Sequence, residues 1–304
     1  MTIAQNRAEP VAMEEQLATS KRREVIEHLF HGLFLLSAFI GVVSVGIIGF
    51  FLIKESIAAV EYAGVSGMIF GMEWLPPALY GIAPMIVGTL MSTAMAIVIG
   101  VPVGLLTAIF LAEIAPPVVA RYMRPAIELL AGIPSVVYGF FGLVVIVPLI
   151  EQVFGVPSGA TVLAGSVVLS VMILPTVIAV SDTSIRALPK QYKEGSLALG
   201  ASHIYTIFKV LLPAARSGIL TGIILGIARA IGETMAIIMV MGNAPAMPHS
   251  VLESARSLTA NIALEMSYAT GVHASALYAT GVVLLLFVMI LNATLMYLNR
   301  EMGK

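Results

Sequence analysis

The sequence predicts an all-α integral membrane protein with six transmembrane helices. Of its 304 residues, 59% are hydrophobic and only 11% are charged. The mean hydropathy of +1.00 lies far above that of soluble globular domains. Six apolar segments also reach the roughly 20 residues that a helix needs to cross a bilayer. Their approximate bounds are 29–53, 83–112, 125–150, 161–181, 217–242 and 275–298.

The first apolar segment is expected to stay in the protein as a span. It follows 28 polar and charged residues, which we interpret as a cytoplasmic N-terminal segment ahead of a permease domain over 29–304. The segment is about twice as long as the core of a signal peptide, and no small-residue cleavage site follows it.

The third and fifth spans contain residues that alter helix packing. Pro134 removes a backbone donor from the third span, so this helix can kink and pack closely against a neighbour. Ser135 and Tyr138 follow it, and their hydroxyls could donate to an oxyanion. In the fifth span small residues recur at every fourth position, which indicates a helix interface. These residues are Gly218, Gly222 and Gly226.

The distribution of positive charge sets the expected orientation. Of the 16 Lys and Arg residues, thirteen fall on one side of a six-span arrangement, whereas only Lys54 and Arg256 fall on the other. Because Lys and Arg are retained on the cytoplasmic side, both termini are expected in the cytoplasm. The polar stretch 182–216 then forms a large cytoplasmic loop.

Two charged residues lie inside the fifth span. Moving one charge to the centre of a bilayer costs at least about 2.5–3.5 kcal/mol, so Arg229 and Glu233 need compensation or a polar cavity. They are four residues apart, which would place them on one helical face as a self-neutralised pair. Alternatively, they line a pore in which the guanidinium of Arg229 binds a passing oxyanion through its planar fork of donors.

Several other kinds of site are excluded or disfavoured. The chain has no cysteine, so it has no disulfide, thiolate metal site or cysteine nucleophile. Of the five histidines, only His28 and His31 have a spacing that could suit a metal ligand pair, at the start of a helix. A metal site there is disfavoured, and no cofactor or catalytic residue is predicted. A phosphate-binding loop of the form G-x-x-x-x-G-K-[ST] does not occur. Any ATP-driven process must therefore draw on a partner chain.

The polar loop contains the stretch "EGSLALGASHIYTIFKVLLP", residues 194–213. Two short helical patterns meet near Gly200, where a chain reversal is sterically tolerated. The pattern predicts a helix-turn-helix on the membrane surface, and a simple connecting loop is the alternative. The stretch resembles the EAA signature of ATP-binding-cassette (ABC) importer permeases, although Gly195 and Ser196 replace the usual two alanines. The matching positions are Glu194, Gly195, Ser196, Gly200, Val210, Leu212 and Pro213.

That resemblance implies the type I ABC importer permease fold, in which this loop couples the permease to an ATPase. Two further stretches, "LLAGIPSVVYGFFGL" (129–143) and "ARAIGETMAI" (228–237), resemble the membrane subunits of phosphate importers. The residues after Gly232-Glu233-Thr234 and the stretch "SLTANIALEM" (257–266) resemble the PstC type of subunit more than its PstA-type partner.

The resemblance implies ATP-driven phosphate import across a bacterial cytoplasmic (inner) membrane. The implied partners are a PstA-type permease, a cytoplasmic ATPase dimer, a periplasmic or extracellular phosphate-binding protein and membrane lipid. The net charge of −1 gives no indication of nucleic acid binding. A substrate pathway would include Arg229, Glu233, Ser135 and Tyr138. Another oxyanion such as sulfate or molybdate is the main alternative, and a secondary transporter or channel is a second.

Overall fold

The computed structural model describes the backbone of residues 8–302 and the side chains of residues 26–294, 296 and 297. It divides into two units, Met1–Lys54 and Glu55–Lys304. Part of the predicted N-terminal segment, residues 1–7, lies outside the described residues, as does Lys304. Within the described residues, six helices are long and apolar enough to cross a membrane, as the sequence predicts.

The first span belongs to helix α1 (Ala8–Ala63), which begins in the first unit and ends in the second. Its apolar side chains from Leu29 to Ile48 are all exposed. The hydroxyl of Ser44 donates to the carbonyl of Ile40 at 2.8 Å, so this polar group is satisfied within the helix itself. These features are typical of a helix that faces lipid.

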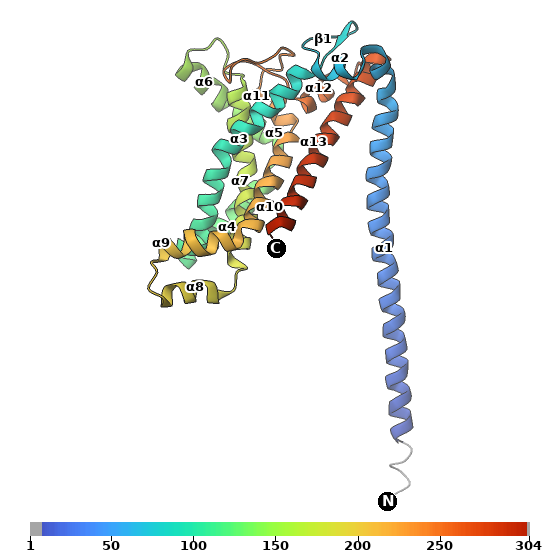
Figure 1. Cartoon of the computed structure of the whole chain (residues 1–304), viewed down its shortest axis with the longest axis vertical. Coiled ribbons are helices and arrows are strands. Elements are labelled where there is room, and N and C mark those ends of the chain that lie inside the picture. The colour runs from blue at the N-terminus through green and yellow to red at the C-terminus, as the bar shows by residue number, and fades with distance from the viewer. Residues whose placement is uncertain (1–7, 303–304) are drawn as a thin grey trace, which may run out of the picture. The chain divides into compact units, whose positions relative to one another are not determined.

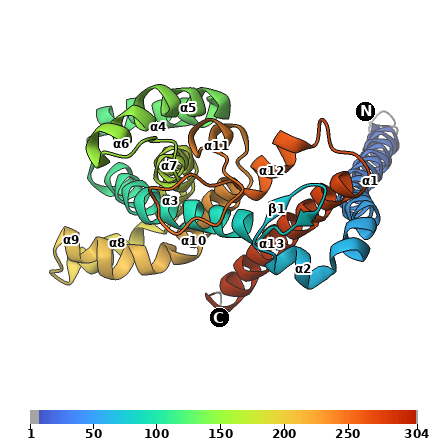
Figure 2. The ribbon, with the colours of Figure 1, turned by 90° about the horizontal axis from the view of Figure 1, so that it is seen from above.

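Helix α7 (Val162–Arg186) is the most buried of the six described spans, and Figure 2 shows it end-on among several neighbouring helices. Helices α3 (Ala83–Ile109) and α10 (Leu212–Ile231) pack against it. Small residues make this approach possible, since a Cβ atom at Gly104 of α3 would lie 2.9 Å from Val177 of α7. The fourth span is longer than the predicted 161–181, because α7 continues to Arg186.

The third predicted span is not one continuous helix. Helix α4 (Pro117–Gly132) ends before Ile133, whose backbone is extended. Ile133 precedes Pro134, and a residue before proline favours an extended conformation over a helical one. The apolar crossing helix begins after Pro134 and runs from Ser135 to Phe154. It consists of α5 (Ser135–Phe141), the π-helical turn η3 (Gly142–Ile146) and α6 (Val147–Phe154). The expected helix over 125–150 is therefore wrong at its start.

The fifth predicted span is also broken. Helix α10 ends at Ile231, and the short helix α11 (Met235–Val240) follows after three residues. At its beginning the helical segment extends back to His203, well before the predicted residue 217. The expected continuous helix over 217–242 is thus wrong at both ends.

Short elements gather at the two ends of the bundle, as Figure 1 shows. At one end lie the π-helical turn η2 (Phe110–Ile114), which follows α3, and an α8–α9 hairpin made of α8 (Lys190–Ala198) and α9 (His203–Thr206). The π-helical turn η4 (Ile207–Leu211) joins this hairpin to α10.

The other end carries a small β-hairpin and short helices. Strands β1 (Trp74–Leu75) and β2 (Leu79–Tyr80) pair antiparallel, with Trp74 opposite Tyr80. The neighbouring elements are α2 (Val65–Phe70), α12 (Leu258–Glu265) and the start of the last span, α13 (Val272–Met302). Buried residues of these segments form one apolar cluster that includes Trp74, Tyr80, Leu258 and Leu277.

Candidate functional site

The break in the fifth span is held by specific hydrogen bonds. A break in a membrane helix frees backbone groups that lipid cannot satisfy. Here the carbonyl of Glu233 accepts a hydrogen bond from Thr259 Oγ1 at 2.6 Å. The carboxylate Oε1 of Glu233 accepts from the backbone N–H of Ala236 at 3.1 Å, inside the first turn of α11. Glu233 therefore stabilises both the linker and the start of the next helix.

This geometry corrects the predicted pair of charges on one helical face. Arg229 lies in the last turn of α10, whereas Glu233 lies beyond its end. Within the described residues, no ion pair joins the two side chains. Each charge instead lies at the helix end whose dipole favours it, the cation at a C-terminus and the anion at an N-terminus. The fifth span accepts these charges because it is two helices.

The guanidinium of Arg229 remains available for a ligand. Arg229 is half-buried, and in the part of the chain that the structure describes it makes neither an ion pair nor a hydrogen bond. It lies close enough to Tyr138 of α5 to interact with it electrostatically. The arginine at the end of α10 is thus within electrostatic range of the second broken segment of the fold.

The two broken segments lie side by side. Helices α5 and α11 pack against each other, and a Cβ atom at Gly139 would lie 2.8 Å from the Cα atom of Ala236. The hydroxyl of Tyr138 donates to the carbonyl of Leu130 at 2.7 Å, across the break that follows α4. This hydroxyl hydrogen therefore has a partner inside the chain, which differs from the expected donation to an oxyanion. Ser135, the other predicted hydroxyl, begins α5 and is half-buried.

The glycine stripe of the fifth span lies against α7. A Cβ atom at Gly218 would approach the side chain of Ser184, and one at Gly226 would lie 3.1 Å from Val177. Gly222 has Val180 as its neighbour in the same way. The glycine face of α10 is thus used for packing against α7, and Arg229, seven residues after Gly222, projects near this face at the end of the helix.

The α8–α9 hairpin has the predicted helix-turn-helix form. Gly200 adopts a φ of +86°, which favours glycine. Its N–H donates to the carbonyl of Leu197 at 2.9 Å, and Ala201 N–H donates to the carbonyl of Ser196 at 3.2 Å. These two bonds form a Schellman motif that ends α8. The next helix begins at once, because Ser202 Oγ accepts the N–H of Tyr205 at 3.2 Å.

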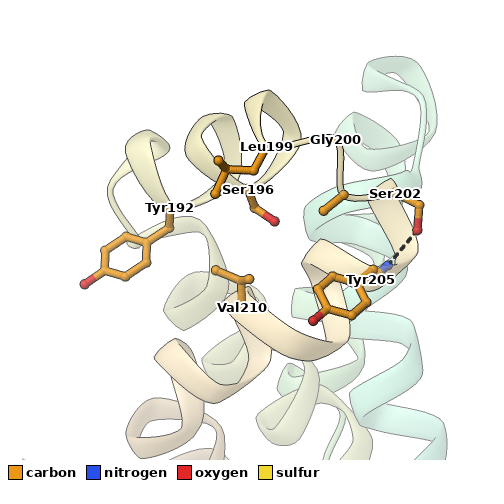
Figure 3. Close-up of a pocket in the computed structure, with 8 residues that line it drawn as sticks. Tyr192, Ser196, Leu199, Gly200, Ser202, Tyr205 and Val210 are labelled. Atoms are coloured by element: carbon orange, nitrogen blue, oxygen red, sulfur yellow. Dashed lines mark hydrogen bonds between the residues drawn. The ribbon is translucent and has the colours of Figure 1, made fainter.

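A groove separates the two arms of the α8–α9 hairpin, and Figure 3 shows the side chains that line it. It has a volume of 670 Å³, and its lining includes Tyr192, Leu199 and Tyr205. Leu199, at the tip, is 91% exposed. Glu194 and Gly195 are also exposed, and Pro213 lies exposed in the first turn of α10, next to the half-buried Leu212. The hairpin thus presents an apolar tip to its surroundings.

Sequence reasoning missed a buried charged cluster at the hairpin end of the bundle. Asp182, which was expected to open the polar loop, is 3% exposed near the end of α7. Arg124 of α4 binds it through two nitrogens at 2.9 and 3.2 Å, and Arg186 lies 3.0 Å from the same carboxylate. This ion pair fixes α4 to α7. The available signal in the sequence was a single Asp directly after the apolar run of the fourth span.

A second missed cluster lies at the opposite end, around Glu265 of α12. Its carboxylate accepts hydrogen bonds from Trp74 Nε1 at 2.9 Å and from Arg256 Nη1 at 2.5 Å, and His273 Nε2 lies at 2.8 Å. Glu265 is 6% exposed. Burial raises the pKa of Glu265, but the bonds to Trp74, His273 and Arg256 together hold this pKa below its ordinary value. The anionic carboxylate therefore joins the β-hairpin, α12 and α13.

Comparison with known proteins gives consistent matches. The family described as "Binding-protein-dependent transport system inner membrane component" matches residues 100–304. The probable ABC transporter permease protein YqgH of Bacillus subtilis is 37% identical over 302 residues, which cover 97% of this chain and 98% of that protein.

Other relatives carry a substrate in their names. The phosphate transport system permease protein PstC of Pasteurella multocida is 37% identical, covering 70% of this chain and 73% of its own length. PstC of Mesorhizobium japonicum is 31% identical, covering 95% and 94%. Among solved structures, a chain of the MetNI methionine ABC transporter in an inward facing conformation has a TM-score of 0.56 at 17% identity, covering 73% of this chain and 97% of its own. That likeness shows the fold, the type I ABC importer permease fold.

Proposed function

This chain belongs to the family of binding-protein-dependent transport system inner membrane components, and from that premise we propose that it is a permease subunit of an ABC importer for inorganic phosphate. The observation that carries the substrate is the 31–37% identity to PstC proteins over 70–95% of the chain. The YqgH relative, which matches over nearly its whole length, carries no substrate in its name.

The geometry at the broken fifth span supports an anionic substrate. Arg229 offers a guanidinium without a carboxylate partner among the described residues, and its fork of donors suits a tetrahedral oxyanion. Discontinuous helices of this kind form substrate sites in many transporters. Ser135 at the start of α5 is a second candidate contact. Glu233, by its negative charge, would keep phosphate binding weak enough for release.

The partners follow from the same proposal. The sequence has no phosphate-binding loop for ATP, so a separate ATPase dimer would hydrolyse ATP and bind the α8–α9 hairpin. The exposed tip of that hairpin, together with Glu194 and Gly195, fits such a docking role. A PstA-type permease would complete the pathway, and a phosphate-binding protein would deliver substrate at the end that carries the β-hairpin.

The function is tested by ATP-dependent uptake in proteoliposomes that contain the complete assembly. We expect labelled phosphate to accumulate only when ATP reaches the ATPase side, and a large excess of sulfate or molybdate not to compete. Accumulation of sulfate or molybdate in place of phosphate would favour the alternative oxyanions. Uptake that an ion gradient drives without ATP would instead identify a secondary transporter.

Membrane orientation is a separate expectation, derived from the excess of Lys and Arg on one side. Because the chain has no cysteine, single cysteines can report it without background. An Ala78→Cys variant, exposed in the β-hairpin, should react with an impermeant thiol reagent in intact cells. An Ala198→Cys variant, exposed on α8, should react only after permeabilisation. The reverse labelling pattern would show that the α8–α9 hairpin lies outside the cell.

A further inference from the structure

Glu113 connects the second span to both arms of the α8–α9 hairpin. It lies in the η2 turn that follows α3, and its side chain is 11% exposed. Its Oε2 atom lies 2.6 Å from Nζ of Lys193 on α8 and 3.5 Å from Nε2 of His203, the first residue of α9. One carboxylate at the end of a span thus contacts two separate surface helices.

Helix α8 contributes little buried surface that could hold the α8–α9 hairpin against the rest of the chain. None of the nine residues of α8, all of which the structure describes, is buried. A cavity of 580 Å³ lies beside α8, lined by residues that include Glu113, Ile185, Lys193, Leu197 and Leu211. Among the described residues, both ion pairs that join the hairpin to the rest of the chain are made by Glu113.

The turn that carries Glu113 is itself well ordered by hydrogen bonds. Ala115 N–H donates to the carbonyl of Phe110 at 2.7 Å and closes the wide π-helical turn. Single π-helical turns occur frequently at functional sites. The carboxylate therefore extends from a fixed support at the end of α3.

From this geometry we propose that Glu113 is a positioning residue of the transport cycle, an inference that rests on the proposed function. It holds the α8–α9 hairpin against the end of α3, so that a displacement of the hairpin reaches two helices at once. One route is covalent and leads through η4 into α10. The other leads through the Glu113–Lys193 ion pair into α3. Both helices pack against α7, so the two routes act on the same core.

The energy of the ion pair is secondary to its position. Lys193 is 38% exposed, and pairs with an exposed partner contribute little to stability. Loss of the pair should therefore leave the fold and the ATPase interaction in place. It should instead let the hairpin move independently of α3, so that ATP is hydrolysed with less transport.

The first test measures coupling in the complete assembly. We expect Glu113→Gln and Lys193→Gln to retain the ATPase subunits and their ATP hydrolysis. Phosphate uptake per ATP should fall about tenfold, which lies within the range by which substitutions along a coupling network change the coupling between sites. The charge-reversed pair, Glu113→Lys with Lys193→Glu, should recover most of that ratio. Glu61→Gln, at an exposed glutamate near the other end of the bundle, is the matched control.

A Glu113→Gln variant that couples as well as Glu61→Gln would overturn the proposal, and so would a reversed pair that recovers nothing.

A second measurement does not depend on transport. Spin labels on Ala198→Cys of α8 and Val118→Cys of α4, both exposed, report the spread of hairpin positions in the full chain. Glu113→Gln should broaden this distance distribution, and an unchanged distribution would also overturn the proposal. Failure of the wild-type assembly to take up phosphate would reject the substrate instead, and the spin-label comparison would still decide the role of Glu113.

Discussion

Replacement of Arg229 by Gln is expected to lower phosphate uptake by about tenfold to a hundredfold, the loss of a hydrogen bond to a charged group of about 1.5–3 kcal/mol. The amount of folded protein should stay at the wild-type level, because Arg229 has no ion-pair partner among the described residues that its removal would leave unpaired. Uptake in proteoliposomes and yield after purification measure the two effects separately. Arg229→Lys should retain part of the activity, since it keeps the charge without the planar fork.

Glu233 provides the control for the Arg229 result. Glu233→Gln removes the charge that caps α11 but keeps an oxygen acceptor. The free energy of unfolding should therefore fall by less than the loss of a cap costs, which is about 0.5–2 kcal/mol. The rate of phosphate uptake should remain close to the wild-type rate, or only the step that releases phosphate should change. The doubly neutral variant should stay inactive, because the positive charge is missing. If that variant were expressed normally and transported at more than half the wild-type rate, Arg229 would not bind the substrate.

Replacement of Glu265 by Gln is expected to destabilise the protein by about 3–5 kcal/mol, the cost of leaving a buried charge without its partner. The stranded charge is that of Arg256, whose side chain is 13% exposed. Thermal unfolding in detergent measures the change. Glu73→Gln, at an exposed glutamate next to β1, should unfold at nearly the wild-type temperature. Equal unfolding temperatures for the two variants would show that the cluster adds no stability.

The same cluster predicts a pH dependence with a definite sign. The pKa of Glu265 is held below its ordinary value of about 4.3 in the folded protein. Its contribution to stability is therefore fully present above the ordinary pKa and is lost as the pH falls through the lowered one. Wild-type protein should lose stability below about pH 4 more steeply than Glu265→Gln, which has no proton to take up there.

The fold class could be predicted from the sequence because hydropathy over 20 residues is a local property. The α8–α9 hairpin could be predicted for a similar reason. Gly200 is the residue that tolerates a positive φ, and the two helical patterns end on either side of it. Both inferences depend on neighbours along the chain, so one sequence suffices.

The helix breaks could not be predicted, because each is stabilised by a side chain that lies beyond the broken helix itself. Thr259 holds the carbonyl of Glu233 from 26 positions away. At the other break Tyr138 donates to the carbonyl of Leu130, which lies only eight residues earlier but on the far side of the break. Membrane helices tolerate Pro and Gly when neighbours satisfy the freed groups, so Pro134 and Gly232 did not by themselves mark an end.

The charged clusters have the same limitation. Glu113 lies 80 residues from Lys193, and Trp74 lies 191 residues from Glu265. Lone acidic residues near span ends were visible in the sequence, but their partners were not. Only the packing of α3, α7 and α12 brings these groups together.

The π-helical turns change how angular position should be assigned along the spans. A turn closed by a bond to the fifth residue holds one residue more than an α-helical turn, and one residue corresponds to about 100° of rotation. A helical wheel started at Ser135 is therefore out of phase beyond Ile146, where η3 ends. The same offset separates α9 from α10, which η4 joins. Cysteine-scanning data on these spans should consequently show a jump in periodicity at each turn, with one accessible stripe before it and a differently oriented stripe after it.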